Sequence, residues 1–152
     1  MMISSLIKRI LGKDAQEILS PREGRLFIRI SREKLRESVK RLAELEGFSH
    51  LSTITGVDTG SEIELIYHLS HRDALVSLRV FVSKEAAAVP TIVDLIPGAS
   101  LYEREVHDLF GVRFDGNTDL SPLLLPDDWP EDIHPLRQEW SLERINERMR
   151  EK

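Results

Sequence analysis

The chain has 152 residues, of which 41% are hydrophobic and 31% are charged, and its formal net charge is −5. This composition is typical of one globular domain, and the negative charge argues against a nucleic-acid-binding protein, which needs a basic face. The chain has no cysteine, so a disulfide, a thiolate-held iron–sulfur cluster and a cysteine-type zinc site are all excluded within it.

The first expected element is an N-terminal helix that ends at Gly12, because apolar residues recur at helical spacing before it (Ile3, Leu6, Ile7 and Ile10). Lys8 and Arg9 interrupt this apolar run, so we do not expect it to be a signal peptide. No later stretch approaches the roughly 18 uncharged apolar residues that a membrane-spanning helix needs.

A strand and a second helix are expected next. In residues 25–30, aliphatic side chains alternate with Arg25, Phe27 and Arg29, which predicts a strand with two different faces. An apolar stripe over 35–43 predicts a helix that Ser31 caps at its start and Gly47 ends.

Three strand-like runs follow, at 51–57, 62–69 and 74–82, with a hairpin turn at 70–73 between the last two. The order of elements predicts an α+β fold: a two-layer sandwich with a mixed or antiparallel sheet of about four strands and helices on one face. The other face would carry Phe27, Phe81 and Arg79, so it would be neither fully polar nor fully apolar.

Charged residues are concentrated in YEREVHDLFGVRFDG, which spans 102–116. Local physics predicts a helix here. Ser100 and Glu103 match a capping box, Arg104 and Asp108 are spaced for an ion pair on one helix face, and Gly111 is a typical helix end.

A metal site is the alternative for this helix, because Glu103 and His107 lie one turn apart. Two ligands do not make a catalytic zinc site, which needs three protein ligands and a water. A small stand-alone metal-dependent enzyme using Glu103, His107 and one further ligand therefore remains an alternative hypothesis, as does a protein-binding module.

The chain from 115 to 139 shows no periodicity and contains four of the seven prolines, with seven acidic residues against one basic residue. We expect an extended, Pro-rich acidic strap over 115–140, which follows a two-layer domain at 1–114 and precedes a C-terminal helix at 141–152. The strap packs on its own domain or lies on a partner, with Trp129 and Arg137 as anchors.

Two motifs, YEREVHDLFGVRFDG and DLSPLLLPDDWPEDIHPLR (119–137), resemble a known family. This family is the 30 kDa subunit of respiratory complex I, or NADH–quinone oxidoreductase, together with relatives in membrane-bound, energy-converting nickel–iron hydrogenases. The resemblance covers about a third of the chain, from Pro90 to Arg137.

The resemblance implies a non-catalytic assembly subunit in the hydrophilic arm of such a complex, with no cofactor, metal or catalytic residue of its own. It implies a peripheral position on the cytoplasmic side of the membrane, with iron–sulfur clusters on other subunits. The partners implied are a large subunit related to the nickel–iron hydrogenase large subunit and the adjacent small iron–sulfur subunit. The residues expected to bind partners are Glu103, Arg104, Glu105, Asp108, Phe110, Asp127, Asp128, Trp129, Leu136 and Arg137.

Three positions depart from the family pattern. The family has His or Lys where this chain has Asn117, and Lys, Arg or Pro where it has Ser121. Quinone-linked members often have an aromatic residue where this chain has His107. These departures favour a hydrogenase-type or archaeal complex.

Overall fold

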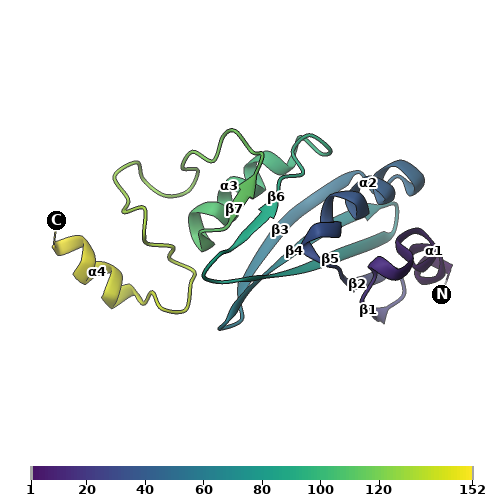
Figure 1. Ribbon diagram of the computed structural model, residues 1–152, viewed down its shortest axis with the longest axis horizontal. Coiled ribbons are helices and arrows are strands. Elements are labelled where there is room, and N and C mark those ends of the chain that lie inside the picture. Colours follow the sequence, from purple (N-terminus) through teal and green to yellow (C-terminus); the bar gives the residue numbers. More distant parts are fainter. Residues whose placement is uncertain (1, 152) are drawn as a thin grey trace.

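A computed structural model describes residues 2–151 of the chain (Figure 1). Its main sheet has five strands in the order β1–β2–β5–β4–β3, all antiparallel to their neighbours except for the parallel pair β2–β5. The strands are β1 (Glu17–Arg22), β2 (Arg25–Arg29), β3 (His50–Asp58), β4 (Glu62–His71) and β5 (Ala74–Ser83).

The sheet has one more strand than the predicted four, because β1 was not recognised in the sequence. Most of its side chains are exposed, so the apolar alternation of a half-buried strand is missing. It also contains Pro21, next to an irregularity in the pairing between Leu19 and Arg22. Proline is tolerated there because β1 lies at the edge of the sheet, where an N–H group can remain unpaired.

Three helices contribute to the core on one face of the main sheet: α1 (Met2–Leu11), α2 (Leu35–Glu46) and α3 (Ala99–Phe110). Alternation along β4 sets this face, since every second side chain of the strand is buried in the core (Ile63, Leu65, Tyr67 and Leu69). The predicted α+β fold, with a mixed sheet and helices on one face, is confirmed.

The ends of α2 differ in how well they were predicted. Gly47 ends the helix in the left-handed conformation, with φ 72°, as expected. The cap predicted at Ser31 is wrong, because the 3-10 turn η2 (Arg32–Lys34) intervenes and the Ser31 side chain makes no capping hydrogen bond. A second 3-10 turn, η1 (Gly12–Asp14), follows α1.

The opposite face of the sheet mixes aromatic and charged side chains, as predicted. The guanidinium groups of Arg29 and Arg79 lie 4.4 Å and 5.2 Å from the ring centre of Phe81. Arg79 also donates to Glu64 at 2.5 Å. The aliphatic and aromatic parts of this face are therefore interleaved with ion pairs.

Two short parallel strands, β6 (Ala88–Pro90) and β7 (Arg113–Asp115), form a second sheet beside α3. β6 precedes the loop that leads into α3, and β7 follows the helix almost at once. This arrangement places Thr91, just after β6, close to the middle of α3.

Residues 116–141, here named the C-terminal segment, form no helix or strand and lead to α4 (Leu142–Arg150). The segment passes α3, and α4 lies at the end of the elongated molecule opposite α1 (Figure 1). Ser141 caps α4, since its hydroxyl accepts from the Arg144 N–H at 3.1 Å. The domain boundaries at 114 and 140 stay predictions.

Across residues 2–151, no helix combines the length and apolar character needed to cross a membrane.

Candidate partner interface

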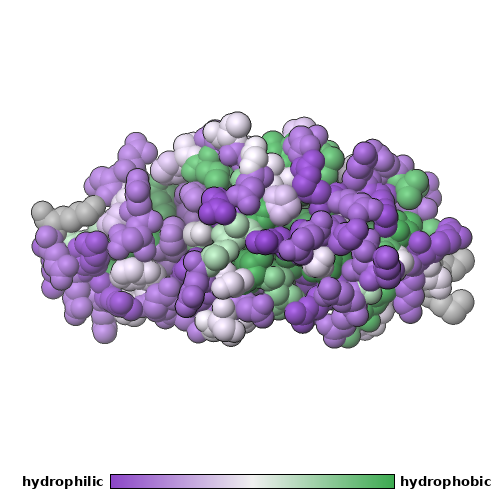
Figure 2. Space-filling view, viewed as in Figure 1, coloured by the Kyte–Doolittle hydropathy of each residue, from purple (hydrophilic) through white to green (hydrophobic). Residues whose placement is uncertain are grey.

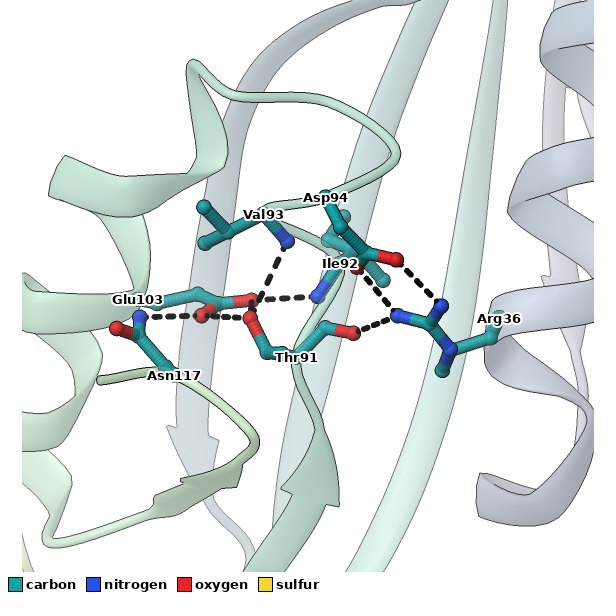
Figure 3. Close-up of polar contacts among 7 residues, drawn as sticks. All are labelled: Arg36, Thr91, Ile92, Val93, Asp94, Glu103 and Asn117. Carbon is teal, nitrogen blue, oxygen red and sulfur yellow. Dashed lines mark hydrogen bonds and ion pairs between the residues drawn. The ribbon is translucent and has the colours of Figure 1, made fainter. Parts of the chain in front are cut away.

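Glu103 is a buried residue in α3 and not part of a helix cap. Its side chain is 0% exposed, and α3 begins at Ala99, so Ser100 lies inside the helix and the predicted capping box is wrong. The Glu103 carboxylate accepts from the Thr91 hydroxyl at 2.7 Å and 3.0 Å, from the Ile92 N–H at 2.9 Å and from the Asn117 side-chain amide at 2.8 Å (Figure 3).

Thr91 links this carboxylate to helix α2. Its carbonyl oxygen accepts from Arg36 of α2 at 2.6 Å, and Arg36 also binds both oxygens of Asp94, at 2.6 Å and 2.7 Å (Figure 3). Such a paired contact has a fixed geometry. The loop after β6 is therefore tied to α2 on one side and to α3 on the other, which fixes the two helices relative to each other.

The two carboxyl groups of this network have opposite pKa shifts. Hydrogen bonds from Arg36 lower the pKa of Asp94 to about 2. Burial raises the pKa of Glu103, because desolvation outweighs the hydrogen bonds that favour its charged form.

The predicted ion pair between Arg104 and Asp108 is wrong, because both side chains bind the C-terminal segment instead. Arg104 donates to the carbonyl oxygens of Ser121 at 3.0 Å and Pro122 at 2.9 Å. Oδ2 of Asp108 accepts from three consecutive backbone N–H groups, at 2.9 Å, 2.9 Å and 3.3 Å (Leu123, Leu124 and Leu125). One face of α3 thus binds the segment's backbone through side chains.

The segment returns to the C-terminal end of α3. The Leu136 N–H donates to the carbonyl oxygen of Leu109 at 3.0 Å, and Nε of Arg137 donates to that of Phe110 at 2.6 Å. Gly111 ends the helix with φ 69°, as predicted, and the His134 ring lies so close that a Cβ on this glycine would be 2.4 Å from it. Carbonyl groups that a helix leaves unpaired at its end are therefore bound by residues of the segment.

Trp129 is folded back within the segment. Its indole N–H donates to the carbonyl oxygen of Ile133 at 2.8 Å, and the Ile133 side chain is only 1% exposed. These residues and the end of α3 line a cavity of about 490 Å³, and His107 and His134 are also part of its wall. Burial lowers the pKa of His134, and the positive charges of Arg137 and His107 act in the same direction.

Most of the residues predicted to bind partners make contacts within the chain. Glu103, Arg104, Asp108, Trp129 and Arg137 have the hydrogen bonds described above, and the ring of Phe110 packs over Gly56 of β3. Glu105 is half-buried, whereas the remaining residues are exposed (Asp127, Asp128 and Leu136). Direct contact of these ten residues with a partner stays a prediction.

Sequence reasoning missed Arg36, Thr91 and Asn117, which complete the buried network. No local spacing marks them, because Thr91 lies 12 positions and Asn117 lies 14 positions from Glu103. Of these three residues, only Asn117 stood out in the sequence, because it departs from the family pattern.

The geometry does not support the metal-site alternative. The Glu103 carboxylate is bound by Thr91, Ile92 and Asn117, while Nδ1 of His107 donates to the carbonyl oxygen of Val112 at 2.8 Å. Within the described range 2–151, no three histidine or carboxylate side chains are grouped so that they could hold a metal ion.

These contacts define a class of structure: a two-layer α+β domain whose third helix binds a long irregular segment from the same chain. Residues 28–146 match the family model described as the respiratory-chain NADH dehydrogenase, 30 Kd subunit. The chain therefore belongs to this family, as its two motifs predicted.

Relatives come from two kinds of complex. The chain is 36% identical over 137 residues to a subunit of the NADH-quinone oxidoreductase of Acidothermus cellulolyticus, and the match covers 85% of this chain and 70% of that protein. It is 33% identical over 118 residues to membrane-bound hydrogenase subunit beta of Pyrococcus furiosus, and this match covers 74% and 68%. Family and relatives identify the chain as a subunit of a membrane-associated oxidoreductase complex, as predicted.

Two solved structures share the fold. One is a chain in the structure of the membrane-bound sulfane sulfur reductase, described as an archaeal respiratory membrane complex. It has a TM-score of 0.86, 30% identity and coverage of 100% of this chain and 93% of that chain. The other is the trypsin-resistant fragment of Nqo5, with a TM-score of 0.67, 28% identity and coverage of 79% of this chain and 100% of the fragment. The first match includes the C-terminal segment and α4, because it covers the whole chain.

Proposed function

We propose that this chain is a non-catalytic assembly subunit on the cytoplasmic side of a membrane-associated oxidoreductase complex, of the NADH–quinone oxidoreductase or energy-converting hydrogenase type. It docks through α3 and the C-terminal segment on a large subunit related to the nickel–iron hydrogenase large subunit, and it adjoins a small iron–sulfur subunit. Other subunits carry the clusters, because this chain offers no thiolate.

One observation carries the proposal: the side chains of the family motifs hold the C-terminal segment on α3. Asp108 binds three consecutive amides, and Arg137 binds the last carbonyl group of the helix. The motif residues thus fix the shape of a surface that the chain presents outward. The likeness over the whole chain to a component of a respiratory membrane complex supports an assembly role for that surface.

The proposal is tested with a tagged chain that replaces the native copy in its source organism. We expect the chain to co-purify from detergent-solubilised membranes with a large subunit and an iron–sulfur subunit in equal amounts. The isolated chain is expected to turn over neither NADH, quinone nor hydrogen. Purification of the chain alone, or turnover by the isolated chain, would contradict the proposal.

A double variant tests the role of the segment. Trp129→Ala with Arg137→Ala removes the hydrogen bonds to Ile133 and Phe110, so we expect loss of the complex while circular dichroism still shows a folded sheet domain. Arg9→Ala, at an exposed position of α1, is the control and should assemble normally. Normal assembly of the double variant would show that the segment is not needed for docking.

A further inference from the structure

Four leucines of α3 and the C-terminal segment are exposed, and three of them lie close in sequence to Arg104 or to the groups that Arg104 and Asp108 bind; the fourth is Leu136. The exposed fractions are 54% for Leu101, 36% for Leu123 and 58% for Leu124. We name these three residues the leucine surface. The neighbouring Leu120 and Leu125 are more buried, and Leu120 packs against the core, so the exposure is selective.

The hydrogen bonds of α3 bring these leucines onto one surface. Leu101, Arg104 and Asp108 share a helix face, because they are spaced by three and four residues. Arg104 binds the carbonyl groups just before Leu123, and Asp108 binds the N–H groups of Leu123 and Leu124 at 2.9 Å each. The charged side chains of this helix face are therefore paired with the backbone of the segment, and the leucine side chains remain exposed to solvent. Figure 2 shows an apolar patch among hydrophilic residues where the segment passes α3.

Acidic residues flank the leucine surface in the sequence. Glu105 is half-buried on α3, and Asp119, Asp127 and Asp128 are exposed in the segment close to the leucines in sequence. Hydrogen bonds from Ser121 lower the pKa of Asp119, so this group stays charged at neutral pH. The nearby cation, Arg104, already binds backbone carbonyl groups. We therefore expect exposed negative charge beside these apolar side chains, at the rim of the leucine surface.

We propose that the leucine surface docks into an apolar hollow rimmed by lysine or arginine side chains on a neighbouring subunit of the complex. This inference rests on the proposed function and assigns the direct contact to the leucines, while the charged motif residues act by positioning them. Charge complementarity favours this occupant. A second copy of the chain, or an anionic membrane surface, would bring negative charge against the negative rim.

A photoreactive amino acid placed singly at three positions tests the contact in the intact complex. The positions are Leu124, Leu101 and, as a matched control, Leu45, which is 64% exposed on α2. We expect positions 124 and 101 to cross-link to a single partner subunit, at peptides that contain lysine or arginine, and position 45 to give no such product. Equal products from all three positions, a product with a second copy, or a product with lipid would each overturn the inference.

Matched substitutions give a second readout. Leu123→Ser with Leu124→Ser should reduce the fraction of chain found in the complex by about tenfold, whereas Leu45→Ser should leave it unchanged. Thermal unfolding of the isolated variants should match that of the native chain, because these side chains are exposed.

The outcomes separate the two proposals. Native-level assembly of the double leucine variant would overturn the leucine surface and leave the assembly role intact. Failure of the native chain itself to associate with any complex would overturn both.

Discussion

At the scale of single residues, Glu103 shows how a charge inside the domain is accommodated. Its carboxylate is fully buried, yet each of its oxygens accepts hydrogen bonds from Thr91 or from neighbouring donors. Desolvation still dominates and raises its pKa above the ordinary 4.5. A buried acid with a raised pKa binds its proton more tightly in the folded chain than in the unfolded chain.

The raised pKa of Glu103 is tested by comparing how the stability of the native chain and of Glu103→Gln depends on pH. Because the folded chain binds the proton more tightly, Glu103 stabilises the fold most below its unfolded pKa and loses this contribution as pH rises through the folded value. The difference in unfolding free energy between the native chain and the variant should therefore fall as pH rises above 4.5. Urea unfolding at several pH values measures it, and a difference that grows with pH would contradict a raised pKa.

At the scale of elements, the contact between α3 and β3 depends on Gly56. A Cβ on this residue would lie 2.6 Å from two ring carbons of Phe110. The ring is 7% exposed, so it has little room to move without shifting the helix. The glycine thus sets how closely α3 approaches the sheet, and with it the position of the α3 residues that hold the C-terminal segment.

Gly56→Ala should destabilise the chain by about 1–3 kcal/mol, the usual effect of overpacking a core. Urea unfolding checks this value. Gly98→Ala is the matched control, because a Cβ there meets nothing within 4 Å, and we expect a change of less than about 0.5 kcal/mol.

The steric origin of this effect has its own test. Phe110→Leu, which shortens the side chain, should recover part of the loss when combined with Gly56→Ala, so the two changes should not be additive. Additive effects would show that the ring does not set the helix position.

Local pattern predicted most elements and failed where the determining contact is distant. The ends of α2 and α3 were predicted correctly because a glycine directly after an apolar stripe is a local signal, and both glycines adopt the left-handed conformation. Strand β1 was missed because an exposed edge strand with Pro21 lacks alternation. Glu103 was misread as a cap because its partners come from other elements, and only the folded chain brings Thr91 and Asn117 to it.

At the scale of the whole molecule, the C-terminal segment is attached both to a helix and to a strand of the main sheet. One is α3, through Arg104, Asp108 and the helix end. The other is the end of β3, where Asp58 accepts from the backbone N–H of Gln138 at 2.8 Å and from its side-chain amide at 3.0 Å. Lys84 adds ion pairs to Asp58 at 2.6 Å and to Glu139 at 2.7 Å. The family motifs indicated an assembly surface from the sequence, but not that their charged residues would bind this segment.

Acid should loosen the segment through His134. Burial lowers the pKa of this residue below 6.5, so the folded chain holds the ring neutral. A depressed pKa gives a contribution to stability that is present above the unfolded value and is lost as pH falls below 6.5 toward the folded value. The indole N–H of Trp129, which lines the same cavity, reports the change by nuclear magnetic resonance.

We expect the Trp129 signal to shift as pH falls from neutral to below 6 while the Trp140 signal stays nearly fixed. In His134→Asn, which keeps a side-chain donor but does not titrate, the Trp129 signal should be independent of pH over this range. An unchanged pH response in that variant would show that another group causes it.

The binding of helix α3's last carbonyl groups by residues 134–137 has a consequence for synthesis on the ribosome. Translation proceeds from the N-terminus, so Phe110 leaves the exit tunnel well before Arg137 is available to it. Until then the carbonyl groups of the final turn of α3 lack these donors, and the turn frays into water. The last turn of the third helix in the nascent domain thus gains these donors only after residues 134–137 have also left the tunnel.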